Sequence, residues 1–166
     1  MTYPRFKGCL TACALAVLAA TASGSAWAQD AMAPAAGASP NAGATPIAGD
    51  ETYKAFHEKE GIQRIIDDFL GRVTTDPRIK QRFEGANLTR LNLMLVQQVC
   101  YLTGGPCDYS GKDMKSAHAG MGLRNDDFNA LAEDLQLSMD KEGVSFPAQN
   151  RLLAKLAPMQ HVIVAH

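Results

Sequence analysis

Residues 103–122 read TGGPCDYSGKDMKSAHAGMG, and this stretch holds His118 between two helical parts of the chain. Its Gly-Gly-Pro triplet predicts the end of a helix, because glycine readily takes the left-handed conformation that closes a helix and proline cannot continue one. The polar residues after the triplet predict a long loop, and residues 112–119 predict a short helix between two glycines. Apolar helices on both sides are placed to cover this histidine, so the sequence predicts a pocket built around His118.

Two helical stripes of apolar residues come before this stretch. The first should end at Asp76-Pro77, because the residue before a proline is pushed out of the helical region. Asn87 is a suitable N-cap for the second, since its side chain can accept a backbone N–H. Short helical turns are predicted within residues 51–57 and 77–83. The stripes consist of Ile62, Ile65, Ile66, Phe69 and Val73, and then of Leu88, Leu91, Leu95, Val99 and Leu102.

The chain after His118 also has helical spacing. Asn125 or Asp126 is expected to cap a helix that ends at Gly143, and Ser145 to cap a last helix that Pro158 kinks. The apolar stripe of the first of these helices consists of Phe128, Leu131, Leu135 and Met139. No segment alternates with period two for long enough to predict a strand. The expected fold class is therefore all-α, with four substantial helices and a long non-helical bridge before the histidine.

The first 28 residues predict a signal peptide. Arg5 and Lys7 give a positive start, an apolar run follows, and residues 25–28 read SAWA, the small-x-small pattern of a cleavage site. The apolar run of ~14 residues is shorter than the ~20 that a membrane span needs. We therefore expect cleavage after Ala28, no stable membrane insertion, and a location in the periplasm or outside the cell. Lipid attachment at Cys13 is less favoured, because the apolar stretch lies mostly after it.

Residues 29–50 are rich in Ala, Pro, Gly, Ser and Thr and have almost no large apolar side chain. Such a segment buries too little surface to offset the entropy of ordering, so we predict a disordered linker and a folded domain over 51–166. Removing residues 1–28 lowers the 16 Lys and Arg to 14 and leaves the 17 Asp and Glu, a formal charge of −3. This charge argues against nucleic acid or an anionic membrane surface as a partner.

Export would leave two cysteines, Cys100 and Cys107, in a compartment where disulfides persist. They bracket the Gly-Gly-Pro turn, and a bond between them is possible if their Cα atoms lie within ~7 Å. A pair of buried thiols is the alternative.

The sequence offers few other motifs that carry chemistry. Two cysteines and four scattered histidines do not make a structural zinc site, and no Cys-x-x-Cys-His motif is present for thioether-linked haem. No Gly-x-Ser-x-Gly motif or phosphate-binding glycine loop occurs. His118 remains, and a lone histidine at a helix end is more often hydrogen-bonded than functional. The functional interpretation is an axial ligand to haem iron between two apolar walls.

Several segments resemble the group I truncated haemoglobins, in the right order and at fitting intervals from about Tyr53 to Ile163. The segments are Asp67-Asp68-Phe69 with Arg72-Val73 and Asp76, then Phe83-Glu84-Gly85 with Asn87, Arg90 and Leu91, and then Leu102-Thr103-Gly104-Gly105-Pro106, Tyr109-Ser110-Gly111, Met114-Lys115 and Ala117-His118. The resemblance implies a two-over-two helical sandwich that holds haem b.

The same resemblance implies roles for single residues. His118 would be the proximal ligand of the iron, Phe83 would pack against the haem, and Lys115 would reach a haem propionate. The haem cavity would be lined by Phe69, Leu91, Leu95, Tyr109, Met114 and Phe128.

The chain departs from the family where a bound gas would be stabilised. Leu70 stands at the position of the usual distal tyrosine, Leu95 replaces a common distal glutamine, and His57-Glu58 replace a glycine pair. We therefore expect a weakly polar distal side and fast release of oxygen. Gln97 and Gln98 are the remaining candidates for a distal donor, and Gln98 is closer to the apolar stripe.

Together these observations predict a haem protein that binds oxygen, nitric oxide or carbon monoxide. Nitric oxide dioxygenation would require an electron donor of unknown identity. One alternative is a periplasmic electron-transfer protein in which Met94 joins His118 as the second iron ligand. A methionine that only fills space at that position is the commoner case. Another alternative is a helical interaction module that has lost haem.

Overall fold

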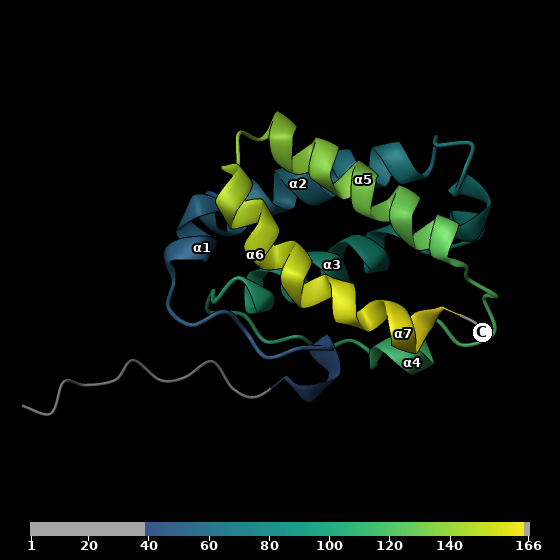
Figure 1. The fold of residues 1–166 in the computed structure, drawn as a ribbon, viewed down its shortest axis with the longest axis horizontal. Helices are drawn as coiled ribbons and strands as arrows, with labels where there is room; N and C mark the ends of the chain where they lie inside the picture. The colour runs from purple at the N-terminus through teal and green to yellow at the C-terminus, as the bar shows by residue number, and fades with distance from the viewer. Residues whose placement is uncertain (1–38, 165–166) are drawn as a thin grey trace, which may run out of the picture. The chain divides into compact units, whose positions relative to one another are not determined.

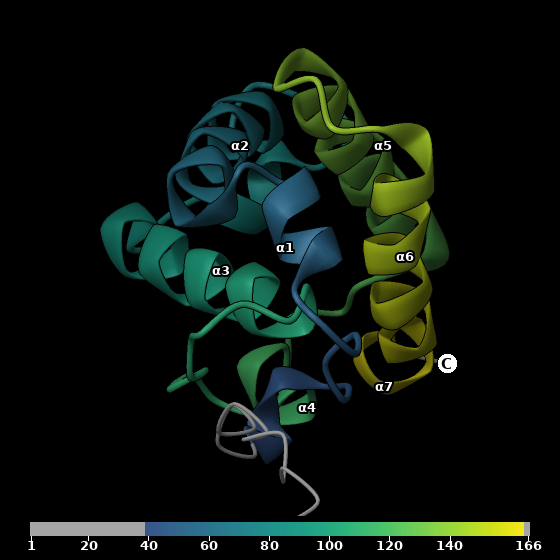
Figure 2. The same cartoon turned by 90° about the vertical axis from the view of Figure 1, so that its left-hand side faces the viewer.

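The computed structural model describes residues 39–164, and within that range the chain is helical. Helices α2 and α3 form one pair and α5 and α6 the other, as Figures 1 and 2 show. Helix α2 packs against both α3 and α5, so it links the two pairs. This arrangement confirms the predicted all-α two-over-two sandwich. The elements are η1 (Pro40–Ala42), α1 (Glu51–Ala55), α2 (Glu58–Val73), η2 (Lys80–Phe83), α3 (Leu88–Leu102), α4 (Met114–Ala117), α5 (Asn125–Lys141), α6 (Phe146–Leu156), η3 (Ala157–Met159) and α7 (Gln160–Ile163).

Helix ends follow the local sequence in most places. Asn87 caps α3, and its side chain accepts the N–H of Arg90 at 2.9 Å. Asp113 caps the short α4 in the same way, through Ser116. The prediction that Asn125 or Asp126 caps α5 was wrong. Arg124 is the N-cap, because the carboxylate of Asp127 reaches back to the Arg124 N–H at 2.8 Å.

Proline shapes the C-terminal part of the chain. Pro158 lies in η3, which divides the predicted last helix into α6 and α7. This break follows from the lack of an N–H on proline and from the clash of its ring with the preceding turn. Within residues 39–164, no helix is both long and apolar enough to cross a membrane.

The corner between α1 and α2 carries backbone strain. His57 and Glu58 both have positive φ, 57° and 59°. An L-residue in this conformation is disfavoured because its Cβ crowds the following carbonyl. Gly61 relieves part of the crowding, since a Cβ at this position would lie 2.1 Å from the carbonyl oxygen of Phe56.

Replacing the two glycines of α2 with alanine should give opposite results. Gly61→Ala must displace the backbone of Phe56, and overpacking of this kind costs about 1–3 kcal/mol. Gly71→Ala meets no atom within 4 Å and should stabilise the helix by about 0.5–1 kcal/mol. Urea unfolding of both variants measures the difference, and equal effects would contradict the tight corner.

An ionic network joins α2 to α5 around Asp68. Arg72 donates to the Asp68 carboxylate at 2.7 Å, and the Ser138 hydroxyl donates to it at 2.9 Å. Lys141 forms an ion pair with the same carboxylate. Burial raises the pKa of Asp68, but the hydrogen bonds from Lys141, Arg72 and Ser138 outweigh it and hold the pKa at about 2. The ionised carboxylate is therefore part of the native packing of these two helices.

Acid should remove this contribution. The pKa of Asp68 is lower in the folded chain than the ordinary value of 3.8, so its stabilisation is present above that pH and disappears as the pH falls toward 2. We expect Asp68→Asn to lower the free energy of unfolding by about 1–3 kcal/mol at pH 7. The difference from wild type should shrink steadily below pH 4 in urea titrations. Ser138→Ala, which removes one donor of the three, should show a smaller loss with the same trend.

The segment before α1 differs from the prediction. Residues 39–50 were expected to belong to a disordered linker, but they lie against the helical domain, and Ala42 is fully buried. Small side chains bury little area themselves, yet they allow the backbone to approach the domain closely enough for hydrogen bonds. The predicted signal peptide, residues 1–28, and the rest of the linker, residues 29–38, lie outside the described residues.

Candidate haem-binding site

His118 sits at the C-terminal end of α4, which Asp113 starts and Gly120 follows. Its Nδ1 lies 2.8 Å from the carbonyl oxygen of Met114, and since a carbonyl only accepts, Nδ1 carries the proton. Within residues 39–164, Nε2 of His118 has no hydrogen-bond partner. A neutral imidazole held through Nδ1 is the form in which histidine binds a metal.

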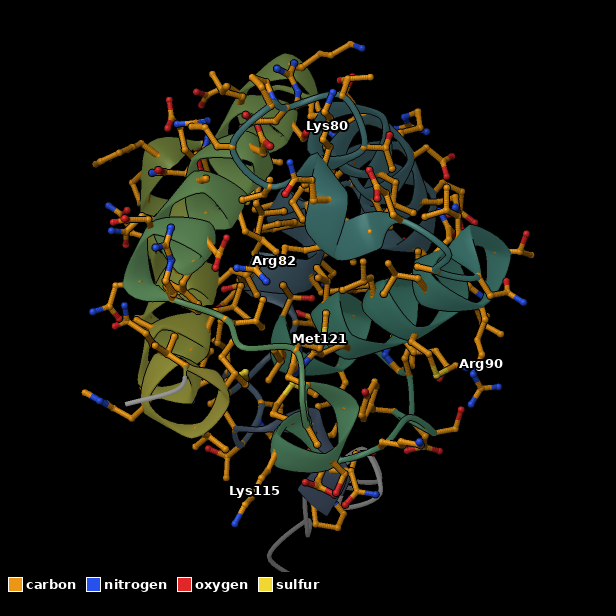
Figure 3. All side chains as sticks on the ribbon, turned by 90° about the vertical axis from the view of Figure 1, so that its right-hand side faces the viewer. Lys80, Arg82, Arg90, Lys115 and Met121 are labelled. Carbon is orange, nitrogen blue, oxygen red and sulfur yellow. A yellow bond between two sulfur atoms is a disulfide. The ribbon has the colours of Figure 1, made fainter. Side chains whose placement is uncertain are left out.

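Several apolar side chains are left half-buried at the edge of the core. They come from the end of η2, from α3 and from α5, and they pack on the core without being covered by it. Figure 3 looks onto this side of the molecule, with Lys80, Arg90 and Lys115 near its rim and Met121 toward its middle. The apolar residues concerned are Phe83, Leu91, Leu95 and Leu131, with Phe128 also half-buried on α5.

The residues expected on the distal side are hydrocarbon. Leu70 lies on α2 and is 8% exposed, whereas Leu91 and Leu95 lie half-buried on α3. Leu70 also borders a surface hollow of about 360 Å³ between α2 and α3, with Asp67, Leu88, Thr89 and Asn92. Leu88 was predicted as part of the buried stripe but is 41% exposed, because it stands at the edge of this hollow.

Both glutamines of α3 are hydrogen-bonded to other parts of the chain. The Gln98 side chain is buried and donates through Nε2 to the carbonyl oxygen of Ala42 at 2.8 Å. The side-chain oxygen of Gln97 accepts hydrogen bonds from the backbone N–H and the hydroxyl of Ser110 in the long loop. The possibility that Gln98 turns toward a bound gas is therefore not supported, because its amide is engaged with the segment before α1.

Other predicted site residues are more dispersed. Phe69 is buried in the core at 3% exposure, and Lys115 is exposed on α4. Tyr109 packs on Gly111 in its own loop, where its hydroxyl donates to the Lys112 carbonyl at 3.0 Å. Burial and then the charge of Asp113 raise the pKa of the Tyr109 phenol, so it stays protonated at neutral pH.

The two methionines proposed for the site behave differently. The Met114 sulfur lies 3.4 Å from the Gln98 amide, so its side chain turns toward the segment before α1. Met94 is half-buried on α3 between Leu91 and Leu95. Its role as a second iron ligand remains a prediction.

An ion pair joins η2 to α5, and the sequence alone did not indicate it. Arg82, at the end of η2, contacts both carboxylate oxygens of Asp127 at 2.9 and 3.2 Å and donates to the Met121 carbonyl at 3.0 Å. Figure 3 shows Arg82 directed toward the segment that carries Met121. Burial raises the pKa of Asp127, but the bonds from Arg82 and the Arg124 N–H lower it below its usual range. The turn η2 is thereby fastened to the segment that follows His118.

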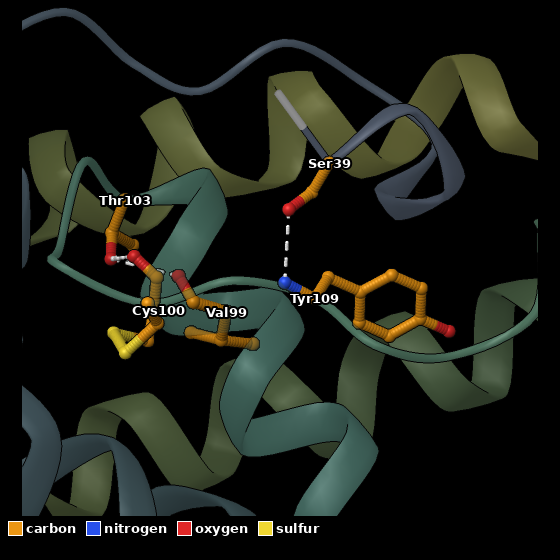
Figure 4. The surroundings of a disulfide bond; sticks show 6 residues. Ser39, Val99, Cys100, Thr103 and Tyr109 are labelled. Atoms are coloured by element: carbon orange, nitrogen blue, oxygen red, sulfur yellow. Dashed lines mark hydrogen bonds between the residues drawn. A yellow bond between two sulfur atoms is a disulfide. The ribbon is translucent and has the colours of Figure 1, made fainter. Parts of the chain in front are cut away.

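The loop before α4 is fixed covalently. Cys100, in the last turn of α3, forms a disulfide with Cys107, and their Cα atoms lie 5.8 Å apart. The Thr103 hydroxyl donates to the Val99 and Cys100 carbonyls beside it, as Figure 4 shows. The sequence left a disulfide and two free thiols as alternatives, and the structure has the disulfide.

These features fit a haem. His118 presents one free nitrogen, and apolar side chains that the core leaves half-uncovered match a flat hydrophobic cofactor. Within the described part of the chain, no three His, Cys, Asp or Glu side chains are placed to hold a bare metal ion. A cofactor that brings its own iron ligands needs only one or two from the protein.

Comparisons with known proteins show the family. The chain is 36% identical to a group 1 truncated haemoglobin of Tetrahymena thermophila, over 46% of this chain and 64% of that protein. It is 29% identical to a group 1 truncated haemoglobin of Mycolicibacterium paratuberculosis, over 60% of this chain and 74% of that protein. The first match therefore spans less than two thirds of its relative. Among solved structures, the Fe(III) truncated haemoglobin of Tetrahymena pyriformis has a TM-score of 0.66 at 24% identity, covering 69% of this chain and 98% of that one. The Bacterial-like globin family model matches residues 51–165, and the chain belongs to this family.

Proposed function

We propose that the chain is an exported haem b protein that binds a diatomic gas on the haem face opposite His118. Globin membership supports haem-based gas binding in general. The observation that carries the proposal for this chain is the hydrogen bond between His118 Nδ1 and the Met114 carbonyl, which leaves Nε2 without a partner among the described residues, in a domain whose core leaves several apolar side chains half-buried. Haem supplies an iron that binds oxygen, nitric oxide or carbon monoxide reversibly and exchanges an electron.

The side chains around the haem would act by exclusion. Leu70, Leu91 and Leu95 carry no donor or acceptor, so they keep water out and offer a bound gas no hydrogen bond. Phe83 and Phe128 would pack on the cofactor from η2 and α5. Lys115 is exposed on α4, next to Met114, where it would reach a propionate.

Location outside the cytoplasm is the second part of the proposal. The Cys100–Cys107 disulfide supports it, because disulfides persist in oxidising compartments and are rare in the cytosol. The charged-then-apolar start of the sequence, ending in SAWA, is typical of a cleaved export signal.

Absorption spectra of the purified protein test the proposal. The ferric, ferrous and carbon monoxide forms should show a Soret band that moves between states, and alkaline pyridine should give the spectrum of non-covalent haem b. A near-infrared thioether band in the ferric form would indicate Met94 ligation and electron transfer instead. Protein that takes up no haem, even when haem is added, would contradict the proposal.

A further inference from the structure

Residues 39–50, which we call the proximal strap, precede the part of the chain that the family model matches. The strap runs along the loop that leads to His118. Ser39 accepts the Tyr109 N–H through its hydroxyl at 3.0 Å (Figure 4). Its own N–H donates to the Tyr101 hydroxyl at 3.3 Å. Farther along, the Asn41 side chain donates to the Gly111 carbonyl, and the Ile47 N–H donates to the Leu102 carbonyl at 2.9 Å. These bonds place the strap on the segment between α3 and α4.

Glycines on both sides allow this close approach. A Cβ on Gly104, whose φ is +88°, would lie 2.0 Å from the carbonyl oxygen of Gly49 in the strap. A Cβ on Gly43, whose φ is +91°, would lie 2.9 Å from Met114 and 2.7 Å from Met159. Figures 1 and 2 both show the strap's short helix, η1, beside α4. The strap therefore touches the helix that carries the candidate iron ligand.

Gln98 connects the strap to α4. Its side chain is 7% exposed, and its Nε2 donates to the carbonyl oxygen of the fully buried Ala42. The same nitrogen lies 3.4 Å from the Met114 sulfur and 4.0 Å from that of Met159. An amide N–H among these groups is satisfied only while the strap is in place, since the carbonyl is its best acceptor.

Met114 then connects Gln98 to His118. The Met114 side chain faces Gln98, and its carbonyl accepts the proton of His118 Nδ1 at 2.8 Å. The backbone N–H of His118 also donates to this carbonyl. The partner of the second ring nitrogen fixes both tautomer and ring orientation of a metal-binding histidine. Any shift of Met114 is thus transmitted to the ring.

We propose that the proximal strap, acting through Gln98 and Met114, sets the orientation of the His118 ring, and that Gln98 is the positioning residue. As a statement about iron ligation it rests on the proposed function. The coupling between strap and ring, however, is a property of the polypeptide and exists without cofactor.

Gln98→Leu tests the coupling, because leucine fills the space but leaves the Ala42 carbonyl without its donor. Gln97→Leu is the matched control, because Gln97 immediately precedes Gln98 in α3. Its side chain bonds to Ser110 and makes no hydrogen bond to the strap or to Met114. In the apoprotein, we expect Gln98→Leu to speed amide exchange at Ala117 and His118 by roughly tenfold, as for loss of one buried hydrogen bond. The ¹⁵N signals of the His118 ring should move toward a mixture of tautomers.

In the haem-loaded ferrous protein, the iron–histidine stretching band in the resonance Raman spectrum should shift and broaden in Gln98→Leu and stay unchanged in Gln97→Leu. Gly43→Ala crowds Met114 while Gln98 is intact, so it should reproduce the shift of the iron–histidine band. This variant replaces Gln98→Leu in the test if Gln98→Leu does not fold. Unchanged exchange, ring signals and Raman band in both Gln98→Leu and Gly43→Ala would overturn the proposal. If the wild type takes up no haem, the proposed function fails, and the apoprotein measurements still decide the coupling.

Discussion

His118→Gly is expected to lose most of its capacity to retain haem, and imidazole should restore it. The substitution removes the imidazole whose Nε2 is proposed to bind the iron, while leaving the apolar residues in place. Loss of even an outer partner of a metal ligand weakens metal binding about 10- to 100-fold. We therefore expect haem to leave His118→Gly at least that much faster than it leaves the wild type.

Rescue is expected because the Met114 carbonyl remains available. Free imidazole in the vacated space can donate one N–H to this carbonyl and present its other nitrogen, as His118 does. Haem transfer to an excess of apomyoglobin, with and without millimolar imidazole, measures the effect. His161→Gly, at an exposed histidine of α7, is the control and should behave as wild type. Wild-type haem retention in His118→Gly without imidazole would identify a different ligand.

Leu70→Tyr is expected to slow oxygen release by roughly 10- to 100-fold. Oxygen gains partial negative charge when it binds a haem, so a hydrogen-bond donor beside it lowers its rate of release. A charge-assisted hydrogen bond is worth about 1.5–3 kcal/mol, which corresponds to this range. In the wild type, the three leucines proposed for the distal side supply no donor, and the Gln98 amide donates to the Ala42 carbonyl.

Leu70→Phe is the matched control, because it adds the same ring without the hydroxyl. Stopped-flow replacement of oxygen by carbon monoxide measures release from the ferrous protein. Carbon monoxide release should change little in either variant, since this ligand gains less charge. Equal rates for Leu70→Tyr and Leu70→Phe would show that residue 70 does not face the bound gas. Slow oxygen release in the wild type would reveal a hydrogen-bond donor that the three leucines and Gln98 do not supply.

Much of the fold could be predicted because it depends on local patterns. Apolar residues at helical spacing located α2, α3, α5 and α6, and the cap at Asn87 and the break at Pro158 follow from the properties of single residues. The α5 boundary was missed by one residue because Asp127 accepts the Arg124 N–H from three positions along the chain. Asn125, Asp126 and Asp127 can all act as capping side chains, and residue type alone does not decide which of them sets the start of the helix.

Long-range contacts of the site could not be predicted. Arg82 and Asp127 are 45 positions apart, and nothing in either neighbourhood indicates the other. The strap was missed for a different reason. Its lack of large side chains suggested a tether, whereas Gly104 lets its backbone meet that of Gly49, and Gly43 lets the segment approach the side chains of Met114 and Met159. The sequence around Gln98 likewise did not indicate whether its side chain faces a bound gas or, as in the structure, the Ala42 carbonyl.

The bonds of Arg82 bear on how quickly a cofactor can be exchanged. They join η2 to the segment after His118 on the side of the molecule seen in Figure 3, so these two segments separate only when the bonds break. An ion pair that is partly exposed weakens with salt, and its carboxylate is lost to protonation in acid. Retention of haem would then be a matter of kinetics, with an escape rate that ionic strength and acidity control, while small gases pass in and out without waiting for the pair to open.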